Sequence, residues 1–431
     1  MDLLVTILLI GVLLAALGSG LWIGLSLLGV AVFAMELLTV KPAGDSMALT
    51  IWGSTSSWTL TALPLFLWMG EILFRSKLSE DMFKGLAPWL DRLPGRLLHV
   101  NIIGCAIFAA VSGSSAATCA TIGKIALPEL KKRGYPDGIT LGTLAGAGTL
   151  GLLIPPSIIM IVYGVAANVS IAKLFIAGVL PGLLLAVLFM GYVVVWSLLH
   201  PGEIPASEGS TTLRQKLHAS RHLIPVVSLI ALVLGSIYSG VATATEAAAF
   251  GVAGALLLAR FEGSLDWRSF VDGLLGATRI YCMIGLILGG AAFLTLAMGF
   301  IGLPRQLAEF IGTLNLSPLM LILCLMALFI VLGCFLDGIS MVVLTISVLL
   351  PTIERAGIDL IWFGIFIVLV VEMAQITPPV GFNLFVLQGL TKREITYIAR
   401  TALPLFVLMM VAVLLVYFFP QVVMALPQQM R

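Results

Sequence analysis

The sequence predicts an all-α polytopic membrane protein, built as an inverted-topology repeat with two re-entrant helical hairpins and two broken helices. Hydrophobic residues make up 60% of the 431 residues and charged residues only 10%, whereas soluble domains carry roughly 25% charged residues. Long stretches carry no charge, and the second half repeats glycine, serine and proline interruptions found in the first. These observations exclude a water-soluble globule.

The charge-free stretches are long enough to cross a bilayer. No Asp, Glu, Lys or Arg occurs between Asp137 and Lys173, between Arg279 and Arg305, or between Arg400 and Arg431, and about 20 apolar residues suffice for one crossing. The first 30 residues lack a basic region and run into a second apolar segment, which favours a retained membrane helix over a signal peptide. The net charge of +2 gives no indication of nucleic-acid binding.

Two halves of the chain match when one is laid on the other with a shift of 223 residues (378 minus 155). Leu127 and Pro128 then fall on Leu350 and Pro351, Pro155 and Pro156 on Pro378 and Pro379, and Pro181 on Pro404. The long polar stretch 200–222 lies near the middle of the chain. It is predicted to link two diverged copies of one unit.

Charge bias predicts that the two copies are inverted. Lys and Arg collect on cytoplasmic flanks, and Arg92, Arg96, Lys131, Lys132 and Arg133 flank segment 100–128 on both sides. Its counterpart 323–351 has no such positive excess, so the two segments are predicted to enter from opposite faces. Each has about 30 residues with a polar break near its centre, which suits a re-entrant hairpin better than one straight span.

The predicted boundaries follow from these segments and from polar breaks, which include 41–57, 75–99, 200–222 and 302–318. The N-terminal scaffold helices occupy 1–57, the first repeat 58–199 with hairpin 100–128 and broken helix 139–168, and the cytoplasmic linker 200–222. More scaffold helices occupy 223–278, and the second repeat occupies 279–423 with hairpin 323–351 and broken helix 360–390. Both termini are predicted outside. Inverted repeats of this kind are typical of secondary transporters.

The hairpin centres and the double prolines are the candidate binding segments. Small residues at 111–118 leave backbone carbonyls and hydroxyls available for a cation, although they also suit close helix packing. Pro155-Pro156 and Pro378-Pro379 each interrupt a helix and release carbonyls that need another partner. A simple kink explains one such pair; two at equivalent positions favour a site at mid-membrane.

A few ionisable residues stand out within the apolar segments. Asp337 is costly at membrane depth and is therefore a functional candidate. Glu372 has three open interpretations: binding an ion, binding a proton, or pairing with a cation such as Lys124. Thr243 and Glu246 have the spacing of a capping box that opens a helix.

Enzyme signatures are absent from the sequence. The four histidines lie in or beside polar flanks, so an intramembrane serine hydrolase using Ser114 or Ser115 would lack a nearby base. No phosphate-binding loop for ATP is present. Transport would therefore run on an ion gradient or by equilibration.

Four motifs occur in order along the chain: the hairpin Ser112-Gly-Ser-Ser-Ala-Ala-Thr118, the following Pro128-Glu-Leu-Lys-Lys-Arg-Gly-Tyr135, the break Leu153-Ile-Pro-Pro-Ser157 and the turn Thr245-Glu-Ala-Ala-Ala249. In this order and spacing they resemble the large membrane (permease) subunit of tripartite ATP-independent periplasmic (TRAP) transporters. The likeness spans nearly the whole chain. One departure is Ala244, where the family often has proline.

The resemblance implies an ion-transporter-like, elevator-type protein of the bacterial inner membrane and no enzyme activity. Sodium would drive uptake of a carboxylate solute delivered by a periplasmic binding protein, and a small membrane subunit on a separate chain would complete the transporter. By position, one sodium site would involve Ser112, Ser115 and Gly151, and the other Gly333, Asp337, Ala374 and Thr377. The solute would lie near Ser114, Thr118, Pro156 and Asn383. The alternative is a stand-alone ion-coupled organic anion permease that needs no binding protein.

Overall fold

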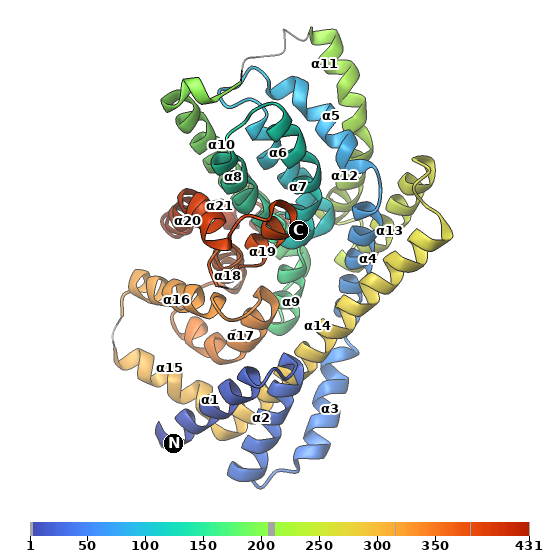
Figure 1. Cartoon of the computed structure of the whole chain (residues 1–431). Helices are drawn as coiled ribbons and strands as arrows, with labels where there is room; N and C mark the ends of the chain where they lie inside the picture. The colour runs from blue at the N-terminus through green and yellow to red at the C-terminus, as the bar shows by residue number, and fades with distance from the viewer. Residues whose placement is uncertain (1–2, 206–211, 315, 380, 431) are drawn as a thin grey trace.

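The computed structural model describes residues 3–205, 212–314, 316–379 and 381–430 (Figure 1). Every regular element in this part of the chain is an α-helix or a short 3-10 helix. Five helical segments there are long and apolar enough to cross a membrane, or seven if two bent pairs each count as one span. The prediction of an all-α protein with many apolar helices is confirmed.

The first part of the chain forms helices α1 to α5. Their bounds are Leu3–Gly18 for α1, Ile23–Leu38 for α2, Ala43–Thr55 for α3, Ala62–Phe74 for α4 and Leu78–Leu90 for α5. Helices α3 and α5 lie inside segments that the sequence predicts as polar breaks. In α5, Leu78, Met82, Leu86 and Leu90 are buried at a helical spacing, so its polar residues occupy only the opposite face.

The segment predicted as the first repeat, 58–199, holds α4 and α5 and continues with helices α6 to α10. Their bounds are Leu98–Ser112 for α6, Ser115–Lys132 for α7, Asp137–Thr149 for α8, Ile158–Ala166 for α9 and Ile171–Leu199 for α10. Helix α8 is rich in small residues and buried along nearly its whole length. A Cβ atom added to Gly142 would lie 2.2 Å from the backbone oxygen of Thr401, so only glycine allows α8 to approach the backbone at Thr401 this closely.

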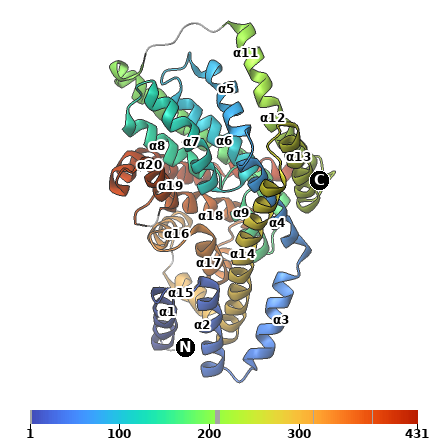
Figure 2. The same cartoon turned by 45° about the vertical axis from the view of Figure 1, so that its right-hand side comes forward.

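The middle of the chain forms helices α11 to α15. Their bounds are Leu213–Ser220 for α11, Ile224–Tyr238 for α12, Ala244–Phe261 for α13, Trp267–Ile301 for α14 and Leu303–Thr313 for α15. The predicted linker 200–222 is thus helical from Leu213 onward, and α11 packs against α5. Helix α14 runs along one side of the molecule in both views and packs against α2, α3 and α4 (Figures 1 and 2).

The segment predicted as the second repeat, 279–423, begins within α14, holds α15 and continues with helices α16 to α21. Their bounds are Pro318–Gly333 for α16, Gly338–Arg355 for α17, Leu360–Ala374 for α18, Phe382–Thr391 for α19, Ile395–Phe418 for α20 and Gln421–Met424 for α21. In both views α16 and α17 lie between α18 and α15 (Figures 1 and 2). Thr401, which Gly142 of α8 approaches, lies on α20.

Several helices of the two repeats are too short to cross a bilayer. Helices α6 and α18 each have 15 residues, which is about 22 Å of helix against a hydrocarbon core of about 30 Å. The contacts between repeats are reciprocal: α7 of the first repeat packs on α19 of the second, and α17 of the second packs on α9 of the first. The interrupted segments of both repeats therefore meet inside the molecule.

Candidate functional site

The tip between α6 and α7 is a tight turn fixed by its own sequence. Gly113 closes α6 in the left-handed conformation with φ of 62°, and Ser114 caps α7 by accepting a hydrogen bond from the Ala117 amide. The Ile158 amide at the start of α9 donates to the Gly113 carbonyl at 3.3 Å. The tip is thereby attached to the helix that follows the first double proline.

Oxygen atoms converge at this first tip. The hydroxyls of Ser112 and Thr118 lie 2.8 Å apart, and both side chains are buried. A Cβ atom at Gly151 would lie 2.5 Å from the Ser114 carbonyl oxygen and 2.8 Å from the Thr118 hydroxyl. Because glycine has no side chain, the backbone of the broken helix lies directly against these oxygens.

Asn383 connects the first tip to the second repeat. The Ser115 hydroxyl donates to the Asn383 side-chain oxygen at 2.8 Å, and the Asn383 side-chain nitrogen donates to the Ala145 carbonyl at 3.0 Å. All of these groups are buried. Asn383, predicted near the solute, is thus engaged on both sides of its amide.

The tip between α16 and α17 resembles the first tip in its capping. Asp337 accepts hydrogen bonds from the amides of Ile339 and Ser340 and from the Ser340 hydroxyl, so it is the N-cap of α17. Ser114, its equivalent at the same shift, is the N-cap of α7. The half-buried carboxylate therefore has a structural partner set that the sequence analysis did not consider.

The remaining residues of the predicted second sodium site also meet. A Cβ atom at Gly333 would lie 2.2 Å from the Ala374 Cβ, and the Thr377 hydroxyl donates to the Met373 carbonyl at 2.7 Å. Gln375, which was not predicted from the sequence, lies between Ala374 and Thr377 in the chain. Its backbone carbonyl accepts a hydrogen bond from the Asn383 backbone amide at 3.1 Å. The available signal was a polar residue two positions before Thr377, directly after the apolar helix α18, whose only charged residue is Glu372.

The structure therefore gathers the predicted residues in two groups. Ser112, Ser114, Ser115, Thr118, Gly151 and Asn383 lie around the first tip, and the Pro156 carbonyl is 2.7 Å from the position of a Cβ on Gly113. Gly333 and Ala374 touch beside Thr377, next to the tip that Asp337 caps. The two groups are joined through Asn383, which contacts Ser115 and Gln375.

The two groups offer mainly hydroxyl, carbonyl and carboxylate oxygens. These are the ligands preferred by hard cations such as Na⁺. No cluster of three or more His, Cys, Asp or Glu side chains with metal-binding spacing occurs in the described residues. The donor set fits the predicted coupling ion.

Of the three interpretations of Glu372, pairing with Lys124 is wrong, and the binding of an ion or a proton stays a prediction. Lys124 is exposed and its ammonium group lies 5.1 Å from the centre of the Phe74 ring. Glu372 is fully buried, and neither carboxyl oxygen has a hydrogen-bond partner in the described part of the chain. The lysine side chain approaches α4 through Phe74, so the ammonium and the carboxylate do not meet.

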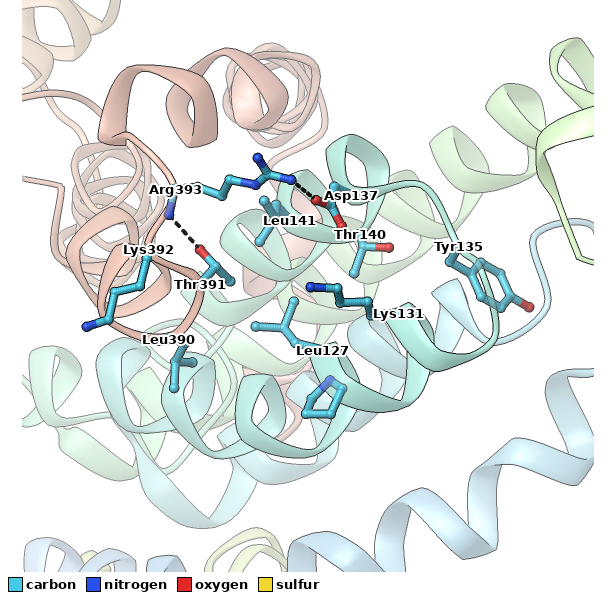
Figure 3. A pocket seen from close by; sticks show the side chains of 11 residues that line it. Leu127, Lys131, Tyr135, Asp137, Thr140, Leu141, Leu390, Thr391, Lys392 and Arg393 are labelled. Atoms are coloured by element: carbon cyan, nitrogen blue, oxygen red, sulfur yellow. Dashed lines mark hydrogen bonds and ion pairs between the residues drawn. The ribbon is translucent and has the colours of Figure 1, made fainter.

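A separate basic pocket lies at the other end of α7 (Figure 3). It has a volume of about 430 Å³. Leu127, Pro128, Lys131, Tyr135, Asp137, Thr140, Leu141, Leu390, Thr391, Lys392 and Arg393 line it. Arg393 pairs with Asp137, which raises the pKa of the guanidinium, and burial raises the pKa of Tyr135. None of the predicted site residues lines this pocket.

A serine hydrolase site is not assembled at the first tip. Ser112 and Ser115 make hydrogen bonds to Thr118 and Asn383. His99 lies at the start of α6 and its ring contacts the Pro94 carbonyl at 2.7 Å, a full helix away from the tip.

The fold of the chain is shared with a solved membrane-protein structure. The chain aligns with the YdaH transporter of Alcanivorax borkumensis at a TM-score of 0.65 and 14% identity, covering 94% of this chain and 98% of that one. At this identity the likeness concerns the fold alone. Residues 10–422 match the family model described as the DctM component of the tripartite ATP-independent periplasmic transporter.

The chain belongs to this family, so it is a TRAP transporter large permease subunit and not an enzyme. It is 33% identical over 396 residues to the C4-dicarboxylate TRAP transporter large permease protein DctM of Pseudomonas aeruginosa, covering 91% of this chain and 92% of the relative. It is 31% identical to the isethionate TRAP transporter permease protein DctMQ of Oleidesulfovibrio alaskensis, covering 90% of this chain but 62% of that longer one. The resemblance stated from the motifs is confirmed.

Proposed function

We propose that the chain imports an organic acid across the bacterial inner membrane, driven by sodium, after a periplasmic binding protein delivers the solute. Family membership supports transport, and the charge-poor sequence with its apolar helices supports a multi-pass location. One contact carries the sodium proposal furthest: the Ser115 hydroxyl on Asn383 joins the oxygen-rich tip of one repeat to the broken helix of the other. An ion bound there would order both repeats at once.

Sodium would be held at two places. Ser112, Ser115 and Gly151 would hold one ion at the first tip, and Gly333, Asp337, Ala374 and Thr377 the other. The ion supplies positive charge among oxygens that otherwise face one another, such as the Ser112 and Thr118 hydroxyls and the Ser114 carbonyl. Coupling requires only that sodium bind the ordered tips more tightly than the disordered ones.

The solute would be an organic anion of the carboxylate class, bound near Ser114, Thr118, Pro156 and Asn383. The solutes in the names of two relatives, C4-dicarboxylates and isethionate, are both organic anions, the first carboxylates and the second a sulfonate. Ser114 is the member of this set whose side chain is only half-buried, so it is the residue most available to a solute. A sodium ion beside it would offset the negative charge of the solute.

An elevator movement would carry the site between the two faces. The hairpins α6–α7 and α16–α17 and the broken helices α8–α9 and α18–α19 would form the moving domain. Helices α2, α3, α4, α13 and α14, which pack on one another, would form part of the scaffold. The reciprocal packing of α7 on α19 and of α17 on α9 supports a single moving body.

Two partners complete the proposal. The family description is of a tripartite periplasmic transporter, so a small membrane subunit and a periplasmic solute-binding protein are expected beside this chain. The longer relative with the compound name DctMQ supports a close association of permease components.

The test is solute uptake by proteoliposomes that contain the large and small subunits, with organic acids supplied on the binding protein. Uptake should need an inward sodium gradient and the binding protein. Ser115→Ala should reduce sodium-dependent uptake, whereas the matched control Ser228→Ala, an exposed serine bonded only to its own helix, should not. Uptake by this chain alone without a binding protein would instead support the stand-alone permease, and uptake unaffected by sodium would contradict the coupling.

A further inference from the structure

The basic pocket at the far end of α7 combines features that the transport proposal does not use. Helices α7 and α8 of the first repeat form one side, and the junction between α19 and α20 of the second repeat forms the other (Figure 3). Three cationic side chains line it against one carboxylate. The pocket is therefore a positively charged cavity between the two repeats.

Two of these cations have no ion-pair partner within the described chain. Arg393 is neutralised by Asp137, but neither Lys131 nor Lys392 takes part in a salt bridge there. Both lysines lie at helix C-termini, where a cation is favoured by the helix dipole. That explanation accounts for their position on each helix, but it leaves a net positive charge in the shared cavity.

A buried hydroxyl in the same wall points independently to a ligand. Thr140 is 4% exposed, and its hydroxyl oxygen has no hydrogen-bond partner among the described residues. Buried polar atoms in native proteins are almost always paired with protein, water or ligand. A hydroxyl can donate to an anion, and Thr140 lines the same pocket as Lys131 and Asp137 (Figure 3).

The pocket also has an apolar wall of Leu127, Pro128, Leu141 and Leu390. Pro128 and Leu390 are exposed, so this wall is open at its edge. A small inorganic anion makes no use of such a wall, whereas a lipid brings an acidic headgroup and an acyl chain together. Basic pockets between membrane helices on the cytoplasmic side bind acidic headgroups in this way, and Lys131 belongs to the basic flank predicted to face the cytoplasm.

We propose that this pocket binds the phosphate headgroup of an acidic phospholipid, with Lys131 and Lys392 as the charge partners and Thr140 as a hydrogen-bond donor. The bound lipid would hold α7 and α8 against the α19–α20 junction, adding to the Arg393–Asp137 pair that already joins them. The proposal concerns the ligand of this pocket and does not depend on the solute or the coupling ion.

The experiment measures thermal unfolding and native mass spectra of the full chain in detergent, with one lipid added at a time. Phosphatidylglycerol or cardiolipin should raise the melting temperature by a few degrees and remain bound in the mass spectrum. Phosphatidylcholine, which has no net charge, and inorganic phosphate should give much smaller shifts. An equal shift with inorganic phosphate would overturn the lipid assignment in favour of a soluble anion.

Two variants locate the effect in the pocket. Lys131→Gln with Lys392→Gln should abolish the lipid-induced shift, whereas the matched pair Lys132→Gln with Arg400→Gln removes the same charge from exposed positions outside the pocket and should keep it. Thr140→Val should leave the lipid-free melting temperature unchanged or higher, since its hydroxyl has no protein partner, and should reduce the shift. An equal loss in the Lys132 and Arg400 control would contradict a specific site.

Discussion

At the scale of single residues, a substitution can separate the structural role of Asp337 from its proposed role in ion binding. Its carboxylate caps α17, and it is also the carboxylate proposed to hold sodium at the second tip. A capping side chain can be supplied by asparagine without a charge. The cap and the ion site therefore respond differently to Asn and to Ala.

We predict that Asp337→Asn keeps the thermal stability of the purified protein but lowers its sodium-dependent uptake, because the cap remains and the charge is lost. Asp337→Ala should lose uptake and also about 1 kcal/mol of stability. Asp359 is the matched control, since it caps α18 through the Ile361 and Trp362 amides away from both tips. Asp359→Asn should leave uptake unchanged; full sodium dependence in Asp337→Asn would remove Asp337 from the ion site.

Glu372 is a buried carboxyl group without a hydrogen-bond partner among the described residues. The Thr149 hydroxyl donates to the Gly146 carbonyl and the Leu153 amide to the Leu150 carbonyl, so the nearest donors are already in use. An unpaired buried polar group costs roughly 1–3 kcal/mol. The cost is present in the folded protein only.

We therefore expect Glu372→Met, which keeps a similar volume, to unfold at the same or a higher temperature than the unsubstituted protein. The measurement is thermal unfolding in detergent at one fixed pH and one sodium concentration. Glu71→Met is the control, because Glu71 is partly exposed and pairs with Arg75, so its loss should change little. A large drop in melting temperature for Glu372→Met alone would show that the carboxyl has a stabilising partner.

At the scale of elements, the interruptions of the helices follow from glycine and proline, and they could be predicted. Helix α6 ends where Gly113 adopts a left-handed conformation, and the helix after Thr149 does not resume until Ile158, beyond Pro155 and Pro156. Helices α3, α5 and α15 were missed, because polar residues lower the average hydropathy of each segment. The helical spacing of the apolar residues Leu78, Met82 and Leu86, which are buried in the structure, was the sequence signal that distinguishes such a helix from a break.

The contact between the first tip and the broken helix depends on the absence of a side chain at Gly151. Gly151→Ala would place a Cβ 2.5 Å from the Ser114 carbonyl, which is backbone and cannot simply rotate away. We predict a loss of ~1–3 kcal/mol in stability, as in other overpacked cores, together with loss of uptake. Gly191→Ala in α10 has no atom within 4 Å of the new Cβ and should be tolerated or slightly stabilising. Normal uptake by Gly151→Ala would mean that the tip does not need this contact.

A charge pair attaches α15 to the second hairpin. Glu309 accepts from Arg305 on its own helix and lies 3.7 Å from Arg355 at the end of α17. Its hydrogen bond with Arg305 lowers the pKa of Glu309 below its ordinary value. A carboxyl whose folded pKa is depressed contributes stability above its unfolded pKa, and that contribution is lost as the pH falls through the folded pKa.

Acidification below the usual glutamate range should therefore loosen α15 from α17. Hydrogen exchange of the α15 amides should rise at low pH, and Glu309→Gln should already show faster exchange at neutral pH with little further change on acidification. The effect is small because the side chains of Arg355 and Glu309 are each about half exposed to solvent. Identical exchange of α15 in the two proteins at every pH would show that the pair does not hold it.

At the scale of the whole molecule, the sequence was informative about the repeat and less so about partners in space. The shift that places Ser114 on Asp337 also places each at the N-cap of the returning helix, so equivalent positions have equivalent local structure. The sequence did not predict which side chains face one another: it left pairing with Lys124 as one of three interpretations of Glu372, although Glu372 is buried and Lys124 is exposed on a different helix. Spacing along a helix predicts a face, but the residue opposite that face depends on packing between distant segments.

Inversion of the two repeats is the property on which alternating access depends, and loop labelling tests it directly. In a background without the five native cysteines, Lys132→Cys and Glu354→Cys place one exposed thiol after each hairpin. The basic flank predicts that Lys132 faces the cytoplasm and Glu354 the opposite side, so an impermeant maleimide should label Glu354→Cys in intact spheroplasts and Lys132→Cys only after permeabilisation. Arg214→Cys, in the exposed part of α11, should behave like Lys132→Cys because it belongs to the same predicted face. If both hairpin ends were labelled from one side, the two halves would be parallel copies, and no movement of a shared central site could open it alternately by exchanging their roles.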